Sequence, residues 1–68
     1  MASRNNNNLK KDLGQKLKNA REKAGLTQAQ VAEKSGLHVN YYARIERGEE
    51  NPTFDKLENI MKTLNIKL

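Results

Sequence analysis

Apolar residues recur at helical spacing near both ends of this chain, and polar residues fill most of the positions between them. The first pattern predicts a helix from about Leu9 to Ala24, because apolar residues three and four apart share one face of a helix. Its predicted buried stripe consists of Leu13, Leu17, Ala20 and Ala24. Gly25 follows, and glycine often ends a helix because it readily adopts a left-handed backbone.

The second pattern predicts a helix in the C-terminal part of the chain. Pro52 disfavours a helical conformation at Asn51, and Thr53 is a suitable cap for the helix that follows. The predicted apolar face consists of Phe54, Leu57, Ile60, Met61 and Leu64. Asn65 is expected to end this helix, and residues 66–68 to form a short tail.

Two shorter helices are predicted in the middle of the chain. Thr27 is a suitable N-cap, and Gln30 stands three residues later, as a capping box requires. Leu26 and Val31 occupy the two positions of a hydrophobic staple. The first of these helices therefore runs from about Gln28 to Lys34.

A glycine turn separates the two short helices. Gly36 can adopt a left-handed conformation at no steric cost, and Ala32 is small enough to let two helices cross closely. His38 stands at the cap position of the second helix, which runs from about Val39 to Arg47 and stops at Gly48. Two helices joined by a glycine turn within about twenty residues form the helix-turn-helix pattern.

Size and composition limit what this pattern can build. The 68 residues allow one small domain, expected at residues 9–68 after a flexible arm at residues 1–8. With no cysteine and a single histidine, neither a metal site nor a cofactor is expected. No apolar run is long enough to span a membrane, and the first residues do not resemble a signal peptide. A cytoplasmic location is therefore expected.

The charge of the chain favours a polyanionic partner. Its formal net charge is +5 and its pI is about 9.8, which suits nucleic acid. Most of the positive excess lies in residues 1–25. The lysines of the first helix lie mostly off its apolar stripe, so we interpret them as a solvated face that could graze a DNA backbone. In the arm, Arg4 could contact a phosphate, and simple disorder is the alternative.

In its ordered set of motifs, the stretch from Leu13 to Leu64 resembles the DNA-binding domain of the Cro and lambda-repressor family, also called XRE-type helix-turn-helix proteins. The matching residues are Leu17, Arg21, Gly25, Leu26, Thr27, Gln28, Val31, Ala32, Gly36, Tyr41, Arg44, Ile45, Glu46, Arg47, Gly48, Asn51, Pro52 and Leu57. The resemblance implies an all-α, lambda-repressor-like bundle of four helices. A fifth helix is common in the family, but this chain is short for it. The resemblance also implies a salt bridge between Arg21 and Glu46.

The second helix of the motif is the predicted reader of DNA, because its N-terminal part meets base edges in the major groove. Asn40 can bond adenine and Arg44 can bond guanine, each in bidentate fashion, and their four-residue spacing puts them on one face. His38 is either a base or phosphate contact or a helix cap. Val39 and Ala43 can touch a thymine methyl group or simply permit close approach.

Phosphate contacts are predicted beside these base-reading residues. Gln28 lies at the N-terminus of the first motif helix, where its amide and the backbone N–H groups can hold a phosphate. The family resemblance implies the same role for Gln28. Tyr41 can reach a phosphate through its hydroxyl, with ordinary surface packing as the alternative. Arg47 is a further candidate phosphate contact.

Two further features depart from the family pattern. Tyr42 stands where an aliphatic residue is usual, and we expect it in the core with its hydroxyl at the surface. Glu49 and Glu50 replace residues that are commonly basic in that loop. They are expected to repel a DNA backbone, which argues against phosphate contacts by the loop side chains.

The sequence predicts a sequence-specific regulator of transcription that binds double-stranded DNA, acting as a repressor on a palindromic operator, with a homodimer as a candidate assembly. A protein-bridging module of the same fold that does not read DNA is the alternative. No enzyme is expected, because no set of nucleophile and base is evident. Antitoxin, restriction-modification controller and phage repressor remain open as biological settings.

Overall fold

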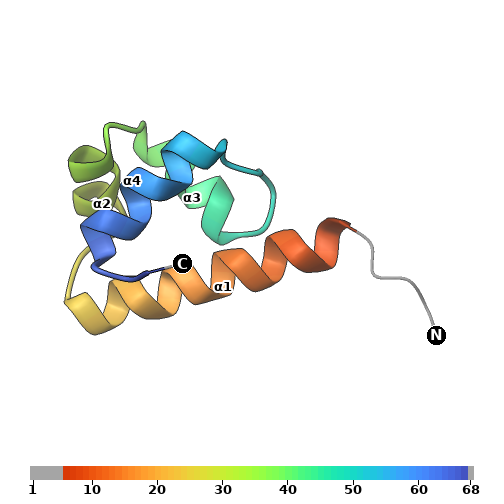
Figure 1. Cartoon of the computed structure of the whole chain (residues 1–68), viewed down its shortest axis with the longest axis horizontal. Helices are drawn as coiled ribbons and strands as arrows, with labels where there is room; N and C mark the ends of the chain where they lie inside the picture. Colours follow the sequence, from red (N-terminus) through yellow and green to blue (C-terminus); the bar gives the residue numbers. More distant parts are fainter. Residues whose placement is uncertain (1–5, 68) are drawn as a thin grey trace.

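Four helices form the computed structural model, which describes residues 6–67 (Figure 1). They are α1 (Asn6–Ala24), α2 (Gln28–Ser35), α3 (Val39–Glu46) and α4 (Phe54–Leu64). Within the described residues there is no strand, so the all-α, four-helix prediction is confirmed. α1 is the longest helix and runs along one side of the molecule, while the other three gather together above it (Figure 1).

α1 begins earlier than the apolar pattern indicated. The predicted helix started near Leu9, whereas α1 starts at Asn6. Asparagine in a helix costs less than about 1 kcal/mol relative to alanine, so an established helix can extend through three such residues. The rest of the predicted arm, including Arg4, lies outside the described residues.

Side-chain caps define the starts of α2 and α4, as predicted. The Thr27 hydroxyl accepts a hydrogen bond from the Gln30 backbone N–H at 3.0 Å, and the Gln30 side-chain carbonyl accepts one from the Thr27 N–H at 2.8 Å. At α4, the Thr53 hydroxyl accepts a hydrogen bond from the Lys56 N–H at 3.2 Å. Each such cap contributes about 1 kcal/mol, so local sequence fixes where both helices begin.

Gly36 makes the turn between α2 and α3. Its φ of 75° lies in the left-handed region, and the next residue, Leu37, donates its N–H to the Ala32 carbonyl at 2.8 Å. Ala32 is buried, as the predicted close approach of two helices requires. The turn therefore closes with its backbone groups satisfied, and α2 packs directly against α3.

One hydrophobic core lies where the four helices meet. Its buried members are Leu17, Val31, Ala32, Tyr42, Ile45, Ile60 and Leu64. Leu13, Ala20, Leu26, Leu37, Tyr41, Leu57 and Ile66 pack against this cluster and are partly buried. Burying a large apolar side chain stabilises a fold by about 1.5–3 kcal/mol, so this cluster is the main source of stability.

Two residues of the predicted apolar stripes are exposed instead, and the prediction was wrong for them. Ala24 lies in the last turn of α1 and borders an open groove beside Leu64. Phe54 is 63% exposed. It is the first residue of α4, and helical side chains lean toward the helix N-terminus, so its ring is directed away from the rest of α4.

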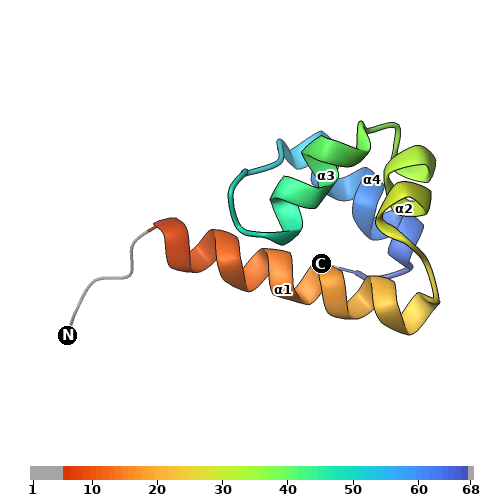
Figure 2. The ribbon, with the colours of Figure 1, turned by 180° about the vertical axis from the view of Figure 1, so that it is seen from behind.

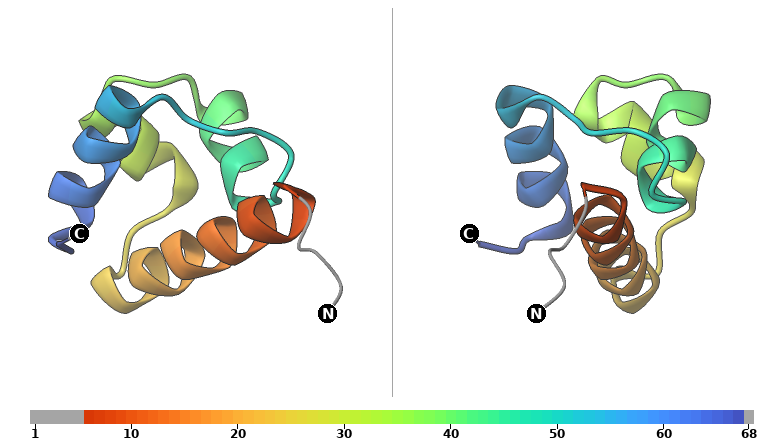
Figure 3. Two further views of the ribbon diagram at one scale, coloured as in Figure 1. Left: turned by 45° about the vertical axis from the view of Figure 1, so that its right-hand side comes forward. Right: turned by 90° about the vertical axis from the view of Figure 1, so that its right-hand side faces the viewer.

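Gly14 sets how closely α1 approaches α3, a role that the sequence pattern did not indicate. This glycine is buried against the C-terminal end of α3, where an added Cβ would lie 2.4 Å from the Glu46 carbonyl oxygen and 2.5 Å from that of Ile45. Gly48 repeats the arrangement, because an added Cβ there would lie 2.6 Å from Cγ of Lys11. α1 therefore crosses the end of α3 nearly backbone to backbone (Figure 3).

No helix among residues 6–67 is both long and apolar enough to cross a lipid bilayer. α1 has 19 residues, enough to span one, but lysines and other polar residues interrupt its apolar stripe.

Candidate nucleic-acid interface

The outward face of α3 carries most of the residues predicted to read DNA. His38, Val39, Asn40 and Arg44 are exposed, and Ala43 is half-buried. The opposite face carries Tyr42, Ile45 and Glu46, all buried. Figure 2 shows α3 in front of α4, with no other helix covering it on that side. Burial of one face thus presents the other to solvent as a protruding rod, the shape that fits a major groove.

Asn40 and Arg44 lie on this outward face one turn apart. Both are exposed, and the Arg44 side chain keeps 52% of its surface in contact with solvent. One offers the amide pair that matches adenine, and the other offers the planar guanidinium that matches guanine. Their spacing of four residues allows them to address neighbouring base pairs.

His38 occupies the N-cap position of α3 by its backbone only. Its φ and ψ are extended, but its side chain makes no capping hydrogen bond to the described backbone. The side-chain cap, one of the two roles considered for this residue, is therefore not realised. The exposed imidazole stands beside Val39 at the end of α3 that would enter the groove.

The two adjacent tyrosines have different environments. Tyr41 is half-buried, and its ring lies 5.8 Å from Nζ of Lys56, at cation–π distance. The packing role is thus present, while the phosphate role of its hydroxyl stays a prediction. Tyr42 is a core residue, as predicted, but its hydroxyl is buried and makes no hydrogen bond to another described residue. The expectation that this hydroxyl reaches the surface was wrong, because the whole side chain is buried in the core; that burial raises the pKa of the hydroxyl.

Arg21, Glu46 and Gln28 form a network that joins three helices. Arg21 donates to the Glu46 carboxylate from Nε at 2.7 Å and from Nη2 at 3.2 Å. It also donates from Nη1 to the Leu26 carbonyl at 3.0 Å. Gln28 donates its amide to the same carboxylate at 2.9 Å. The predicted salt bridge is therefore present, and it holds the end of α3 against the start of α2.

The environment of Glu46 keeps its carboxyl ionised. Burial alone would raise the pKa of this group, but the hydrogen bonds from Arg21 and Gln28 outweigh that effect and lower it. Gln28 is consequently held by a contact inside the protein, although its side chain remains partly exposed. Its phosphate contact stays a prediction. The donors available for that contact are the remaining amide hydrogen of Gln28 and the backbone N–H groups at the start of α2.

A hollow beside this network gathers further basic residues. It is lined by Lys11, Gln15, Lys18, Gln28, Glu46, Arg47 and Glu49. The sequence predicts for these two lysines a solvated face that could graze a DNA backbone, without placing them beside Gln28. Lys11 and Lys18 are seven residues apart, which is close to two helical turns, so their spacing was the available signal that they share a face. The hollow brings them to the N-terminus of α2, where a phosphate would be attracted.

Arg44 of α3 and Arg47, the C-cap residue of that helix, are each paired with a glutamate of the following loop. Arg47 donates to both oxygens of Glu49, from Nε and Nη2, at 3.0 Å each. Arg44 donates from Nη2 to Glu50 at 3.3 Å. These loop carboxylates were expected only to repel DNA, whereas the structure shows them bound to two of the residues predicted to contact it.

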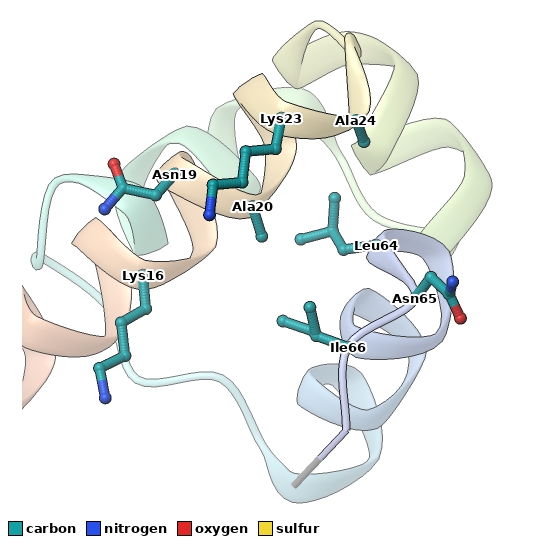
Figure 4. A pocket seen from close by; sticks show the side chains of 8 residues that line it. All are labelled: Lys16, Asn19, Ala20, Lys23, Ala24, Leu64, Asn65 and Ile66. Atoms are coloured by element: carbon teal, nitrogen blue, oxygen red, sulfur yellow. The ribbon is translucent and has the colours of Figure 1, made fainter.

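A second groove lies between α1 and the end of α4 (Figure 4). It is lined by Lys16, Asn19, Ala20, Lys23, Ala24, Leu64, Asn65 and Ile66. It shares no lining residue with the basic hollow. Among residues 6–67, no group of three or more acidic or histidine side chains is placed to hold a metal ion.

Comparison with known proteins decides the family. A profile described as helix-turn-helix matches residues 17–68. This chain belongs to the helix-turn-helix family. It is of the Cro and lambda-repressor (XRE) type, whose members are DNA-binding transcriptional regulators.

Two curated helix-turn-helix relatives illustrate the range of the family. The immunity repressor protein of Bacillus phage phi105 is 41% identical over 56 residues, which are 82% of this chain and 39% of the repressor. Control protein C.BamHI of Bacillus amyloliquefaciens is 36% identical over 62 residues, which are 90% of this chain and 76% of that protein. The chain therefore spans less than half the length of the phage repressor.

A solved helix-turn-helix structure has the same architecture. The restriction-modification controller protein C.AhdI from Aeromonas hydrophila superposes with a TM-score of 0.83 at 31% identity, over 85% of this chain and 88% of that chain. The two folds therefore agree over most of this chain.

Proposed function

We propose that this chain is the sequence-specific, duplex-binding part of a transcriptional repressor, with no catalytic role. The observation that carries the proposal is the uncovered outer face of α3, where Asn40 and Arg44 stand exposed one turn apart. Membership of a family of DNA-binding regulators supports it, as does the net charge of +5. Because the relatives are named as bacterial and phage regulators, we place its action in the bacterial cytoplasm.

The proposed binding divides into reading and anchoring. In the major groove, Asn40 and Arg44 would bond base edges, while His38, Val39 and Ala43 would contact neighbouring bases or the sugar-phosphate edge. Anchoring would fall to the start of α2 and to the basic hollow. The proposed phosphate contacts in this region are Gln28, Arg47, Lys11 and Lys18. Tyr41 of α3 is a further proposed phosphate contact, outside the hollow. Such contacts fix the register of a protein on the duplex without carrying sequence information.

We further propose that a homodimer binds a palindromic operator. One α3 of 8 residues can cover only a few base pairs. Two copies related by a twofold axis would read two half-sites about one helical turn apart, the geometry described for helix-turn-helix repressors in general. The phage immunity repressor among the relatives supports the repressor assignment.

The test is selection of binding sites from a random duplex library, followed by titration with a selected duplex and a scrambled duplex of equal length. At physiological salt the selected duplex should bind at least about 10³-fold more tightly. A palindrome in the selected sites, with two chains bound per duplex, would support the dimer. Equal affinity for both duplexes would instead favour the protein-bridging alternative.

A further inference from the structure

Two glutamates, Glu49 and Glu50, follow Arg47 and Gly48 in the loop after α3, and the end of that helix fixes the path of the chain there. Gly48 adopts a φ of 77°, and its N–H donates to the Ile45 carbonyl at 3.1 Å. The Glu49 N–H donates to the Arg44 carbonyl at 2.9 Å. Gly48 is also packed against the backbone of Lys11. The chain thus leaves α3 along a defined path that brings both carboxylates back toward Arg44 and Arg47.

Glu49 is placed where a DNA phosphate would be held. It lines the same hollow as Lys11, Lys18 and Gln28, and Arg47 holds its carboxylate with two hydrogen bonds of 3.0 Å. A carboxylate and a phosphate present similar pairs of oxygens to a guanidinium. Glu49 therefore offers Arg47 the kind of acceptor that a DNA backbone would offer.

Glu50 stands in the same relation to Arg44. It accepts a hydrogen bond from the guanidinium at 3.3 Å, and that guanidinium is the group proposed to read a guanine. The Arg44–Glu50 and Arg47–Glu49 pairs are largely exposed, with side-chain exposures of 52% and 34% in the first and 56% and 53% in the second. Exposed pairs of this kind shift an equilibrium by up to about fivefold, so DNA can displace them.

We propose that Glu49 and Glu50 are positioning residues that compete with DNA for Arg47 and Arg44. In the unbound protein they hold both guanidinium groups, and a duplex must exchange each carboxylate for a phosphate or a base edge. The two glutamates thereby set the affinity for DNA below the value that the arginines alone would give. This inference rests on the proposed function and concerns how strongly the same surface binds.

The test compares three charge-removing variants, Glu49→Gln, Glu50→Gln and Glu58→Gln, on one selected duplex. All three change the net charge by the same amount, but Glu58 lies on α4 and forms no ion pair with another described residue. The first two variants should each bind about two- to fivefold more tightly than the unmodified chain, and Glu58→Gln should change affinity by less than either. Equal gains for all three would overturn the proposal.

A double-mutant cycle separates competition for the arginines from simple repulsion of DNA. The gain from Glu50→Gln should vanish in an Arg44→Ala background, and the gain from Glu49→Gln should vanish in an Arg47→Ala background. If each gain persists without its arginine, the glutamate acts on DNA directly and the proposal fails. Thermal unfolding of every variant, expected to match the unmodified chain, checks that the fold is unchanged.

Salt dependence adds a readout that a purely structural role would not move. When Arg47 binds a phosphate, it releases a cation from the duplex. The displaced Glu49 carboxylate then lies beside the phosphates and retains a cation, which offsets that release. Glu49→Gln should therefore steepen the slope of log affinity against log salt by up to about one. An unchanged slope together with unchanged affinity would overturn the role of Glu49. Absence of specific duplex binding by the unmodified chain would be a different result, the failure of the proposed function itself.

Discussion

Arg21 of α1 holds the carboxylate of Glu46, 25 residues later at the end of α3, with two hydrogen bonds. Only 13% of the Arg21 side chain and 3% of the Glu46 side chain are exposed. The pair is thus largely removed from water, and its main effect is to fix α1 and α3 in one orientation. Removing one partner of such a pair lowers the stability of the fold strongly, because the remaining charge stays buried without its partner.

Arg21→Ala is therefore expected to lower the free energy of unfolding by about 3 kcal/mol. Chemical denaturation followed by circular dichroism would measure the loss. Arg21→Lys is the matched control, because it keeps the charge but not the two-pronged guanidinium, and it should lose less. If Arg21→Ala and Glu46→Ala both unfold at the same midpoint as the unmodified chain, the pair is not formed in solution.

Gly14→Ala is expected to destabilise the fold by about 1–3 kcal/mol, the usual cost of overpacking. The new methyl group would meet the carbonyl oxygens of Ile45 and Glu46, which belong to backbone and cannot rotate away. Alanine is otherwise the better helix former by up to about 1 kcal/mol, so steric conflict has to exceed that gain. Asn19→Ala, at an exposed position of the same helix, is the control and should stay within about 0.5 kcal/mol. A more stable Gly14→Ala variant would show that α1 and α3 lie farther apart.

Acid should remove the contribution of Glu46 to stability. Because the pKa of this carboxyl is lowered in the folded state, its contribution is present above the unfolded value of about 4.5 and is lost as pH falls through the folded value. The difference in unfolding free energy between the unmodified chain and Glu46→Gln should be largest near neutral pH and shrink toward pH 3. Glu49→Gln is the control: the pKa of Glu49 is also lowered, by Arg47, but its pair is exposed, so its difference should be small throughout. If the difference in unfolding free energy for Glu46→Gln stays constant with pH, the pKa of Glu46 is not lowered in the folded state.

Substitutions on α1, α2 and α3 should separate base reading from anchoring. Arg44→Ala should weaken the preferred duplex by about 1–3 kcal/mol and relax base choice at one position, and Asn40→Ala should do the same at another. Gln28→Ala should weaken all duplexes by a similar factor and leave the salt slope almost unchanged, because this residue is neutral. Lys18→Ala should lower that slope by about one if the lysine meets a phosphate.

A base-by-base affinity profile at two salt concentrations measures all four variants. Since Gln28 also bonds to Glu46, its variant needs a parallel unfolding curve at the assay temperature. Arg44 is assigned wrongly if its alanine variant binds every sequence more weakly by one factor and keeps the base profile intact.

The sequence predicted what depends on neighbours within about one turn of helix. Thr27 with Gln30, and Thr53 with the N–H of Lys56, are contacts of this kind. Gly36 could be placed at the turn for the same reason. The Arg21–Glu46 pair spans 25 residues and was found only through the family resemblance, because spacing alone does not relate two separate helices.

The packing contacts between different helices could not be predicted from the sequence. The contact of Gly14 with the end of α3 depends on where two helices cross, which no local pattern encodes. Phe54 matched the apolar period of α4 yet is exposed, because the period says which face a residue shares and not how far the neighbouring helices extend. In the candidate site, the outward face of α3 was predicted from motif geometry. The pairing of Glu49 and Glu50 with arginines needed the path of the loop.

The shortness of α3 ties recognition to the folding equilibrium. With 8 residues it is well below the length of about 12–15 at which an isolated helix becomes marginally stable in water, so it exists as a helix only while Tyr42 and Ile45 are seated in the core. A duplex that binds only the folded chain must then add to its stability, by about 2.7 kcal/mol at a hundred times the dissociation constant. By the same linkage, a core substitution far from DNA lowers apparent affinity as soon as part of the population unfolds. Weak binding by a variant of this protein therefore reports a lost contact only after its folded fraction has been measured.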